Sequence, residues 1–364
     1  MSQGEEGADA KDGATLSRRT LLRTAGAVGL AAPLGLLGSR VFAGTDPTAN
    51  APICSGIEQV ADAATGALKP LKLTWNANAI CTVAVPAADT QGIFAKHGLA
   101  VEMINFGGST DQLLEAIATG KADAGVGMAL RWLKPLEQGF DVKLTSGIHG
   151  GCIRLLTSKQ TGISDLAGLK GKTIAVSDMA SPAKNFFSIV LKKQGIDPTS
   201  DVEWRQYPPD LLALAIQKGE AQALADGDPN TWLLRKNFDL VEVATNLSGE
   251  YRDRSCCVLG VRGSLIRQDR PAAGALTRAL LEAGEWVANN PDEAAGIFAK
   301  YSTASVQDLS AMLQSHTHHH HPIGGSFRQE IAAYTDELKR VDVIKPGTDP
   351  DKFADKVYAD VLTS

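Results

Sequence analysis

The strongest constraint on the fold is a helix–glycine–strand junction that occurs twice, about one hundred residues apart. Residues 116–124 (AIATGKADA) are echoed by residues 215–223 (AIQKGEAQA), an offset of 99. Residues 94–99 and 191–196 form a second such pair, with an offset of 97. Each glycine suits the left-handed residue that ends a helix before a strand begins. Although such junctions are common, two matches at nearly one offset predict two α/β lobes of similar construction.

Hydrophobic periodicity places strands and helices alternately within each repeat. The strands are expected at 71–75, 101–105, 122–127, 173–176, 202–204 and 221–225, and the helices at 111–119, 181–194 and 211–218. This alternation predicts βαβ units and mostly parallel sheets with helices on both faces. Two such lobes form a cleft, and clefts between domains are common ligand sites.

The N-terminus reads as an export signal. Ser17-Arg18-Arg19-Thr20-Leu21-Leu22 precedes a weakly apolar stretch and the small residues of Val41-Phe42-Ala43. This arrangement resembles a twin-arginine signal peptide cleaved after Ala43. Glycines and a proline make the stretch too short and too weakly hydrophobic for a membrane anchor. The sequence therefore predicts a periplasmic protein whose mature chain contains no membrane span.

Composition excludes several classes of protein. The 364 residues are 44% hydrophobic and 21% charged, which argues against global disorder. The net charge of −5 argues against a nucleic-acid binder held by phosphate contacts. The five cysteines are Cys54, Cys81, Cys152, Cys256 and Cys257, with no C-x-x-C pair. One disulfide and a set of buried free thiols both remain open, and the sequence does not reveal a pairing.

Three segments carry a resemblance to a known family. They are residues 92–102 (GIFAKHGLAVE), 106–110 (FGGST) and 116–127. They resemble the periplasmic binding proteins of nitrate, sulfonate and taurine ABC transporters, a family that also includes pyrimidine-precursor binders. The resemblance covers roughly residues 70–340. It implies a two-lobed α/β fold of the type II periplasmic binding protein class, which closes around a small ligand and delivers it to membrane permease subunits.

The resemblance also implies a domain organisation and a ligand class. Residues 1–43 are the signal peptide and 44–69 a leader, 70–152 and 256–364 form lobe 1, and 153–255 form lobe 2. The expected ligand is a small anion of the nitrate, aliphatic sulfonate or taurine, or bicarbonate class. The alternatives are a pyrimidine precursor of thiamin, a metal or metal chelate, and a catalytic relative of the pyrimidine-precursor synthases. Catalysis is disfavoured because the common hydrolase, metalloprotease and nucleotide-binding motifs are absent from the sequence.

Ligand contacts are expected where strands end and helices begin, because backbone N–H groups and helix N-termini favour anions there. The candidate residues are Asn78, Gly107, Gly108, Ser109, Thr110, Arg154, Ser177, Ser181, Lys184 and Asp228. Ordinary helix capping is the alternative for Ser109, Thr110, Ser181 and Asp228, and a solvated strand position is the alternative for Arg154. An acidic side chain in the cleft, such as Asp226 or Asp228, would instead favour a ligand carrying an amine.

A histidine-rich segment stands apart from the family pattern. It reads His316-Thr317-His318-His319-His320-His321-Pro322. Imidazoles suit zinc, nickel or copper, so these five histidines are the candidate ligands of a divalent metal. No other cofactor is predicted. The alternative is a solvent-exposed loop with only incidental metal affinity.

The export prediction can be tested directly. Changing Arg18 and Arg19 together to lysine should block export, because twin-arginine recognition tolerates this change poorly. Cell fractionation and immunoblotting would measure it. Periplasmic accumulation of the double variant at the wild-type level would contradict the assignment.

Overall fold

The computed structural model describes residues 67–106 and 110–363. The predicted signal peptide and nearly all of the predicted leader lie outside the described residues, as do Cys54 and three candidate ligand residues, Gly107, Gly108 and Ser109. In the described part of the chain, none of the helices has the length and apolar character needed to cross a membrane.

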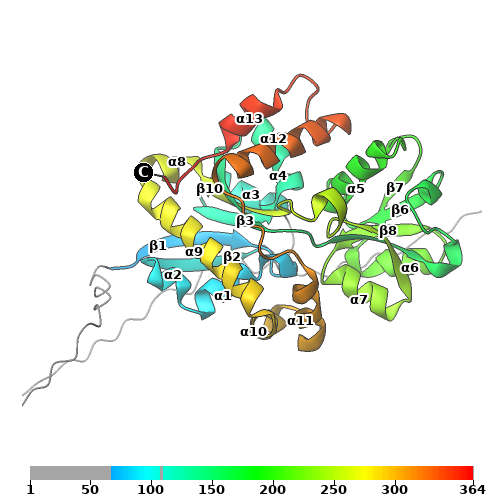
Figure 1. Cartoon of the computed structure of the whole chain (residues 1–364), viewed down its shortest axis with the longest axis horizontal. Helices are drawn as coiled ribbons and strands as arrows, with labels where there is room; N and C mark the ends of the chain where they lie inside the picture. Colours follow the sequence, from blue (N-terminus) through cyan, green and yellow to red (C-terminus); the bar gives the residue numbers. More distant parts are fainter. Residues whose placement is uncertain (1–66, 107–109, 364) are drawn as a thin grey trace, which may run out of the picture. The chain divides into compact units, whose positions relative to one another are not determined.

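Two five-stranded sheets form the framework (Figure 1). Sheet A has the order β2 (Leu99–Asn105), β1 (Lys69–Trp75), β3 (Ala124–Met128), β10 (Cys257–Arg262) and β4 (Val142–His149). Sheet B has the order β7 (Glu203–Gln206), β6 (Thr173–Val176), β8 (Ala223–Gly227), β5 (Ile153–Ser158) and β9 (Leu240–Thr245). In each sheet the first three strands are parallel, and the fourth is antiparallel to both of its neighbours.

The matching strand orders explain the repeat in the sequence. Gly120 and Gly219, which occupy equivalent places in the two repeats, have φ angles of 78° and 72°. Gly98 and Gly195 of the second pair have φ angles of 74° and 73°. These are left-handed conformations that a side chain disfavours, so the predicted glycine junctions are confirmed. The chain passes between the sheets twice, through residues 150–152 and again through residues 246–256.

Helices flank both sheets (Figure 1). Those that contact strands of sheet A include α1 (Ala84–Thr90), α2 (Ile93–Lys96), α3 (Thr110–Ala118), α4 (Ala129–Glu137), α8 (Gly263–Gln268) and α9 (Arg270–Asn289). Those that contact strands of sheet B include α5 (Pro182–Lys193), α6 (Leu212–Gln217) and α7 (Asn230–Asn237). The three helices predicted within the repeats correspond to α3, α5 and α6, with small differences at their ends.

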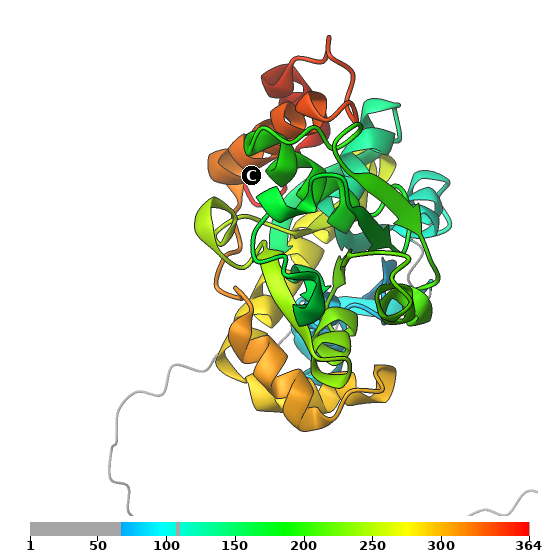
Figure 2. The same cartoon turned by 90° about the vertical axis from the view of Figure 1, so that its right-hand side faces the viewer.

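Four further helices complete the described chain: α10 (Pro291–Phe298), α11 (Val306–Ser315), α12 (Gly324–Arg340) and α13 (Pro350–Val357). Helices α10 and α11 pack together, as do α12 and α13. The two pairs lie on opposite sides in both Figure 1 and Figure 2, so the histidine-rich connection from α11 to α12 runs between them.

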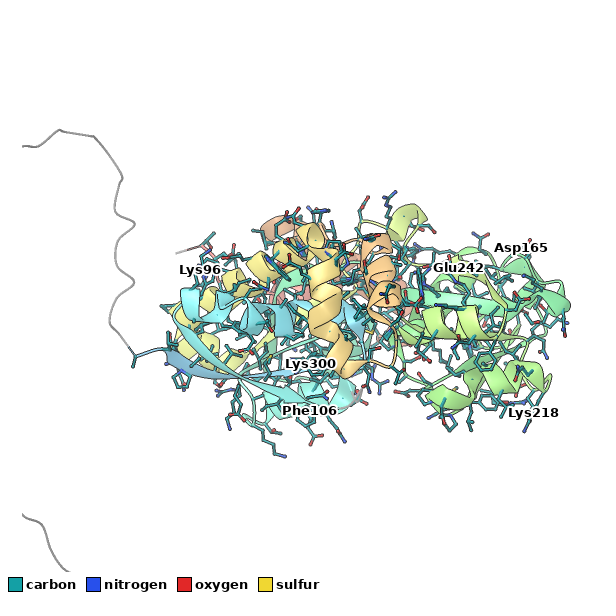
Figure 3. All side chains as sticks on the ribbon, turned by 90° about the horizontal axis from the view of Figure 1, so that it is seen from below. Lys96, Phe106, Asp165, Lys218, Glu242 and Lys300 are labelled. Atoms are coloured by element: carbon teal, nitrogen blue, oxygen red, sulfur yellow. The ribbon has the colours of Figure 1, made fainter. Side chains whose placement is uncertain are left out.

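The exposed side chains Lys96 and Lys218 point away from the ribbon (Figure 3).

A buried tryptophan holds α4 close to sheet A. Trp132 is fully buried. A Cβ atom added at Gly127 of β3 would lie 2.2 Å from its Cζ2 atom, and one added at Gly260 of β10 would lie 2.7 Å from its Cζ3 atom. The indole therefore occupies space that only glycine leaves free. This packing fixes the start of α4 beside the end of β3, and so positions Arg131.

The packing predicts opposite effects at two glycines. Gly127→Ala should destabilise the fold by about 1–3 kcal/mol, because overpacking forces the strand and Trp132 apart. Gly296→Ala on α10 is the matched control, because an added Cβ there meets nothing within 4 Å. It should be neutral or stabilising by about 0.5–1 kcal/mol. Urea unfolding would measure both, and equal free energies of unfolding for the two variants would contradict the packing argument.

Candidate functional site

A cavity of about 340 Å³ lies between the strand ends of the two sheets. Its walls come from segments that follow β1 and β3 in sheet A and β6 and β8 in sheet B. Ligands of α/β proteins bind in this place, outside the carboxyl ends of parallel strands. The described polar side chains in the lining are Asn76, Asn78, Asp111, Arg131, Ser177, Asp178, Ser181, Asp226, Asp228 and Asn230.

The structure brings four of the predicted ligand residues to this cavity: Asn78, Ser177, Ser181 and Asp228. Arg154 and Lys184 are not part of its lining. Thr110 begins α3, but its side chain lies outside the description.

Ser181 has a structural role as well as a place in the cavity wall. It is the N-cap of α5, and its hydroxyl accepts a hydrogen bond of 3.1 Å from the backbone N–H of Lys184. Pro182 follows at the first helical position, where its missing N–H costs nothing. The helix N-terminus therefore opens onto the cavity, as the sequence predicted for this segment.

Lys184 points elsewhere. Its side chain lines a separate hollow that α3 and α4 also border, and its Nζ lies 5.5 Å from the centroid of the Trp204 ring. Burial lowers the pKa of its ammonium group. Lys184 therefore lies against the ring of Trp204 and does not line the cavity.

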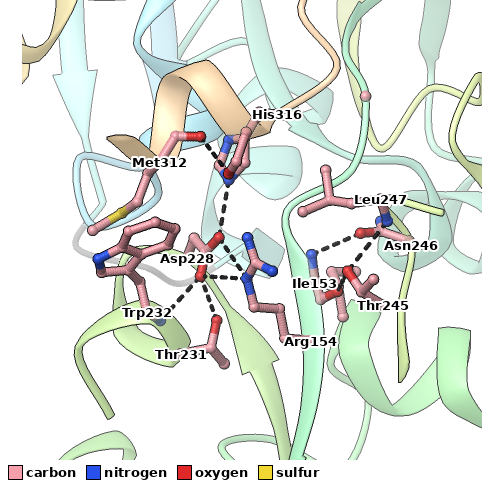
Figure 4. Close-up of polar contacts among 12 residues, drawn as sticks. Ile153, Arg154, Asp228, Thr231, Trp232, Thr245, Asn246, Leu247, Met312 and His316 are labelled. Carbon is pink, nitrogen blue, oxygen red and sulfur yellow. Dashed lines mark hydrogen bonds and ion pairs between the residues drawn. The ribbon is translucent and has the colours of Figure 1, made fainter. Parts of the chain in front are cut away.

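Asp228 is bound from several directions (Figure 4). Its carboxylate accepts hydrogen bonds from Arg154 Nε at 2.9 and 3.2 Å and from Thr231 Oγ1 at 2.5 Å, and it lies 2.9 Å from His316 Nε2. Burial would raise the pKa of Asp228, but His316 and Arg154 hold it below its ordinary value. Arg154 is itself buried, and its other partner is Glu242 at 2.5 Å. Arg154 thus supports the cavity wall from behind.

Arg131 links the two sides of the cavity. Its guanidinium group donates from Nε to Asp111 at 2.7 Å, and its Nη2 lies 3.3 Å from a carboxylate oxygen of Asp178. Asp111 belongs to α3 beside sheet A, whereas Asp178 follows β6 of sheet B. The charge of Arg131 is therefore already balanced by carboxylates from both sides.

Asp226 adds a further carboxylate at the end of β8. It accepts hydrogen bonds from Asn230 at 2.8 Å and from Ser177 at 3.4 Å. Burial nevertheless raises its pKa, and the charge of Asp228 adds to that effect. The described lining thus contains four aspartates and one arginine, so it is acidic.

The histidine-rich segment separates into different environments. His316 and His318 are buried. His319 is exposed, with Nδ1 at 3.6 Å from Glu285. His320 Nε2 lies 2.5 Å from Glu330, and this hydrogen bond raises the pKa of His320. His321 lies over Gly284, where an added Cβ would be 2.6 Å from the imidazole. The five predicted metal ligands are therefore not brought to one point.

Four cysteines gather near the two passages between the sheets. Cys81, Cys152, Cys256 and Cys257 are all buried, and they are free thiols in the structure. The sulfur atoms of Cys81 and Cys257 are 3.2 Å apart. Hydrogen bonds from Cys152 and Cys257 hold the pKa of Cys256 well below its ordinary value.

Sequence reasoning missed the cavity residues Asn76, Arg131, Asp178 and Asn230, and also the buried His149. Each of the four cavity residues lies at or just after a strand end, so the strand-to-helix rule that selected Ser177 and Ser181 applies to them as well. His149 ends β4, and no local motif distinguishes it.

Comparisons with known proteins agree with this architecture. The family model described as NMT1/THI5 like matches residues 82–294. No curated protein sequence matches the chain. The alkanesulfonate-binding protein SsuA from Xanthomonas axonopodis pv. citri, solved with MOPS, is 18% identical with a TM-score of 0.65, over 78% of this chain and 96% of that one.

Two further solved structures are similar in fold. The periplasmic nitrate-binding protein NrtA from Synechocystis PCC 6803 is 15% identical with a TM-score of 0.67, over 81% of this chain and 87% of that one. A zinc-bound ligand-binding component of an ABC-type import system from Staphylococcus aureus is 16% identical with a TM-score of 0.66, over 81% of this chain and 97% of that one. The predicted periplasmic binding protein fold is thereby confirmed.

The raised pKa of Asp226 predicts how stability depends on pH. The folded state holds this proton more tightly than the unfolded state does, so ionisation of Asp226 costs stability as the pH rises through its folded pKa. Asp226→Asn should therefore raise the free energy of unfolding at pH 7, and the gain should disappear below about pH 4. Urea unfolding at both pH values would measure it.

Asp308→Asn is the control with the opposite sign. The pKa of Asp308 is lowered by its hydrogen bonds from Lys236 and Ser305. Its ionised form therefore stabilises the fold at neutral pH, and this contribution is lost as the pH falls through the folded pKa. Asp308→Asn should destabilise the protein at pH 7. A loss of stability of similar size in Asp226→Asn would contradict the assignment for Asp226.

Proposed function

The chain belongs to the NMT1/THI5-like family, and from this membership and the described cavity we propose that it is the substrate-binding component of an ABC importer. The observation that carries the proposal is the cavity between the strand ends of two similarly built sheets, with Arg131 bonded to both sides. A small ligand enclosed there would be handed to membrane permease subunits. SsuA, NrtA and the Staphylococcus aureus protein are ligand-binding proteins, which supports this role.

We propose binding without catalysis. The described residues that line the cavity include no histidine, cysteine or lysine, so they supply neither a thiol nucleophile nor a histidine or lysine base to activate Ser177 or Ser181. Their polar groups are carboxylates, amides, hydroxyls and one guanidinium group. Such groups suit recognition by hydrogen bonds. A periplasmic location follows from this role and from the export signal expected at residues 1–43.

The described charges favour a ligand with an amine or another positively polarised nitrogen group. Arg131 is neutralised by Asp111 and Asp178, and the buried Asp228 is paired with Arg154, which leaves Asp226 as the carboxylate without a basic partner among the described lining residues. Two like charges about 4 Å apart repel by about 4 kcal/mol at an effective dielectric constant of about 20. A small anion would therefore meet repulsion there. An aminopyrimidine, the alternative that the family resemblance raised, belongs to the favoured class.

One observation favours the small anion predicted from the sequence. The N-terminus of α5 opens onto the cavity beside Ser181, and a helix N-terminus carries roughly half a positive charge. The carboxylates in the described lining outweigh this partial charge. Nitrate, sulfonate and bicarbonate therefore form the second candidate class.

Thermal unfolding of the full chain with small ligands tests the proposal. We expect aminopyrimidines or other small amines to raise Tm, because a ligand that binds only the folded state stabilises it. Nitrate, alkanesulfonates and bicarbonate should not. Asp226→Asn should weaken amine binding about tenfold or more, as expected for loss of a charged hydrogen bond.

The matched control is Asp239→Asn. Asp239 is 80% exposed and pairs with Lys159 outside the cavity, so its variant should bind like the wild type. A rise in Tm with an anion that Asp226→Asn leaves unchanged would refute the amine assignment in favour of the anion. No shift with either class would argue against a ligand in this cavity.

A further inference from the structure

We propose that His149, His316 and His318 form a buried binding site for a late first-row transition metal, beside the ligand cavity rather than in it. One nitrogen from each ring lies within 4.8 Å of the others. The centroid of the His149 ring lies 5.3 Å from that of His316 and 4.7 Å from that of His318. None of these residues lines the cavity.

Each ring has one nitrogen without a partner among the described residues: Nε2 of His149, Nδ1 of His316 and Nε2 of His318. All three residues are more than nine-tenths buried. Buried polar atoms are normally hydrogen-bonded, so three unpaired nitrogens in one place need an explanation. A shared metal ion would satisfy all of them at once.

The second nitrogen of each ring indicates which tautomer is present. Nδ1 of His149 lies 2.7 Å from the carbonyl oxygen of Gly150, which can only accept, so this nitrogen carries the proton. Nε2 of His316 faces the Asp228 carboxylate at 2.9 Å and likewise donates. The backbone of Leu313 also forms a hydrogen bond with the His318 ring.

In the neutral imidazole, each of these outer contacts leaves the lone pair on the unpartnered nitrogen. Such second contacts, from carboxylates and backbone carbonyls, commonly orient the histidines of metal sites. Burial and the neighbouring rings also lower the pKa of His149 and His318, so both are neutral ligands at physiological pH. The geometry thus presents three oriented nitrogen donors, one from each ring.

The donor set indicates the class of metal. Imidazole nitrogens suit zinc, copper and nickel, whereas magnesium and calcium prefer oxygen ligands. The sulfurs of Cys81 and Cys257 lie within 4.8 Å of each other and of a His149 nitrogen, which also favours softer metals. Two nitrogens bound to tetrahedral zinc lie about 3.3 Å apart, so nitrogens within 4.8 Å of one another need to approach by at most about 1.5 Å.

This site differs from chelation by an exposed run of histidines. His149 ends β4 and is far from the histidine-rich segment in sequence, while His319 within that segment is exposed. The buried site therefore predicts loss of metal in a His149 variant, whereas chelation by the exposed run predicts loss in a His319 variant. This contrast supplies the matched control.

Zinc titration of the full chain, stripped of metal and competed with a chromophoric chelator, tests the proposal. We expect one tight zinc ion per chain. His149→Asn and His318→Asn should each weaken zinc binding tenfold or more. His319→Asn, the same substitution on an exposed neighbour, should leave the affinity within about twofold. Calcium and magnesium should not compete.

Two results would overturn the proposal: wild-type zinc affinity in His149→Asn, or an equal loss in His319→Asn. Far-UV circular dichroism of the metal-free variants checks that they fold. If both buried variants fail to fold, X-ray absorption of the zinc-loaded wild type decides. At least two imidazoles around zinc would support the site, whereas a shell of oxygen alone or sulfur alone would overturn it.

Discussion

The buried carboxylate of Asp228 is the contact on which the rest of the site depends. It joins Arg154 of β5 to His316, which follows α11, and it forms part of the cavity wall. A buried charge is tolerated only when it is paired, and removing one partner of a buried pair costs about 3–5 kcal/mol. The carboxylate therefore fixes three segments that are distant in the sequence.

The same pairing separates the two proposed binding sites chemically. On one side of Asp228 lies the acidic cavity, where Asp226 and the neutralised Arg131 favour a ligand with hydrogen-bond donors. On the other side lies His316, whose proton is held on Nε2 by Asp228 so that Nδ1 faces His149 and His318. A change in the charge or position of Asp228 would therefore affect both the ligand and the metal.

The fold was predictable because its signals are local. Gly120 and Gly219 permit a left-handed backbone because they lack a side chain. The Ser181-Pro182 cap starts a helix through the serine hydroxyl and the proline ring. The same rule placed Ser177 and Asp228 near the cavity. His149 escaped prediction because its role depends on how distant strands pair, including the antiparallel insertion of β10 between β3 and β4. Lys184 was misleading, since its local charge is accommodated by Trp204.

The histidine-rich segment shows why composition alone does not locate a metal site. His316 has extended backbone angles, with φ −85° and ψ 161°, and successive side chains of an extended segment point to opposite sides. His316 and His318 can therefore face His149 together, while His319 faces outward toward Glu285. Affinity for a metal depends on donors that are fixed and unprotonated, which burial and outer hydrogen bonds provide. Two histidines of the segment, His316 and His318, are buried and held by outer hydrogen bonds, and their third partner, His149, comes from the end of a strand.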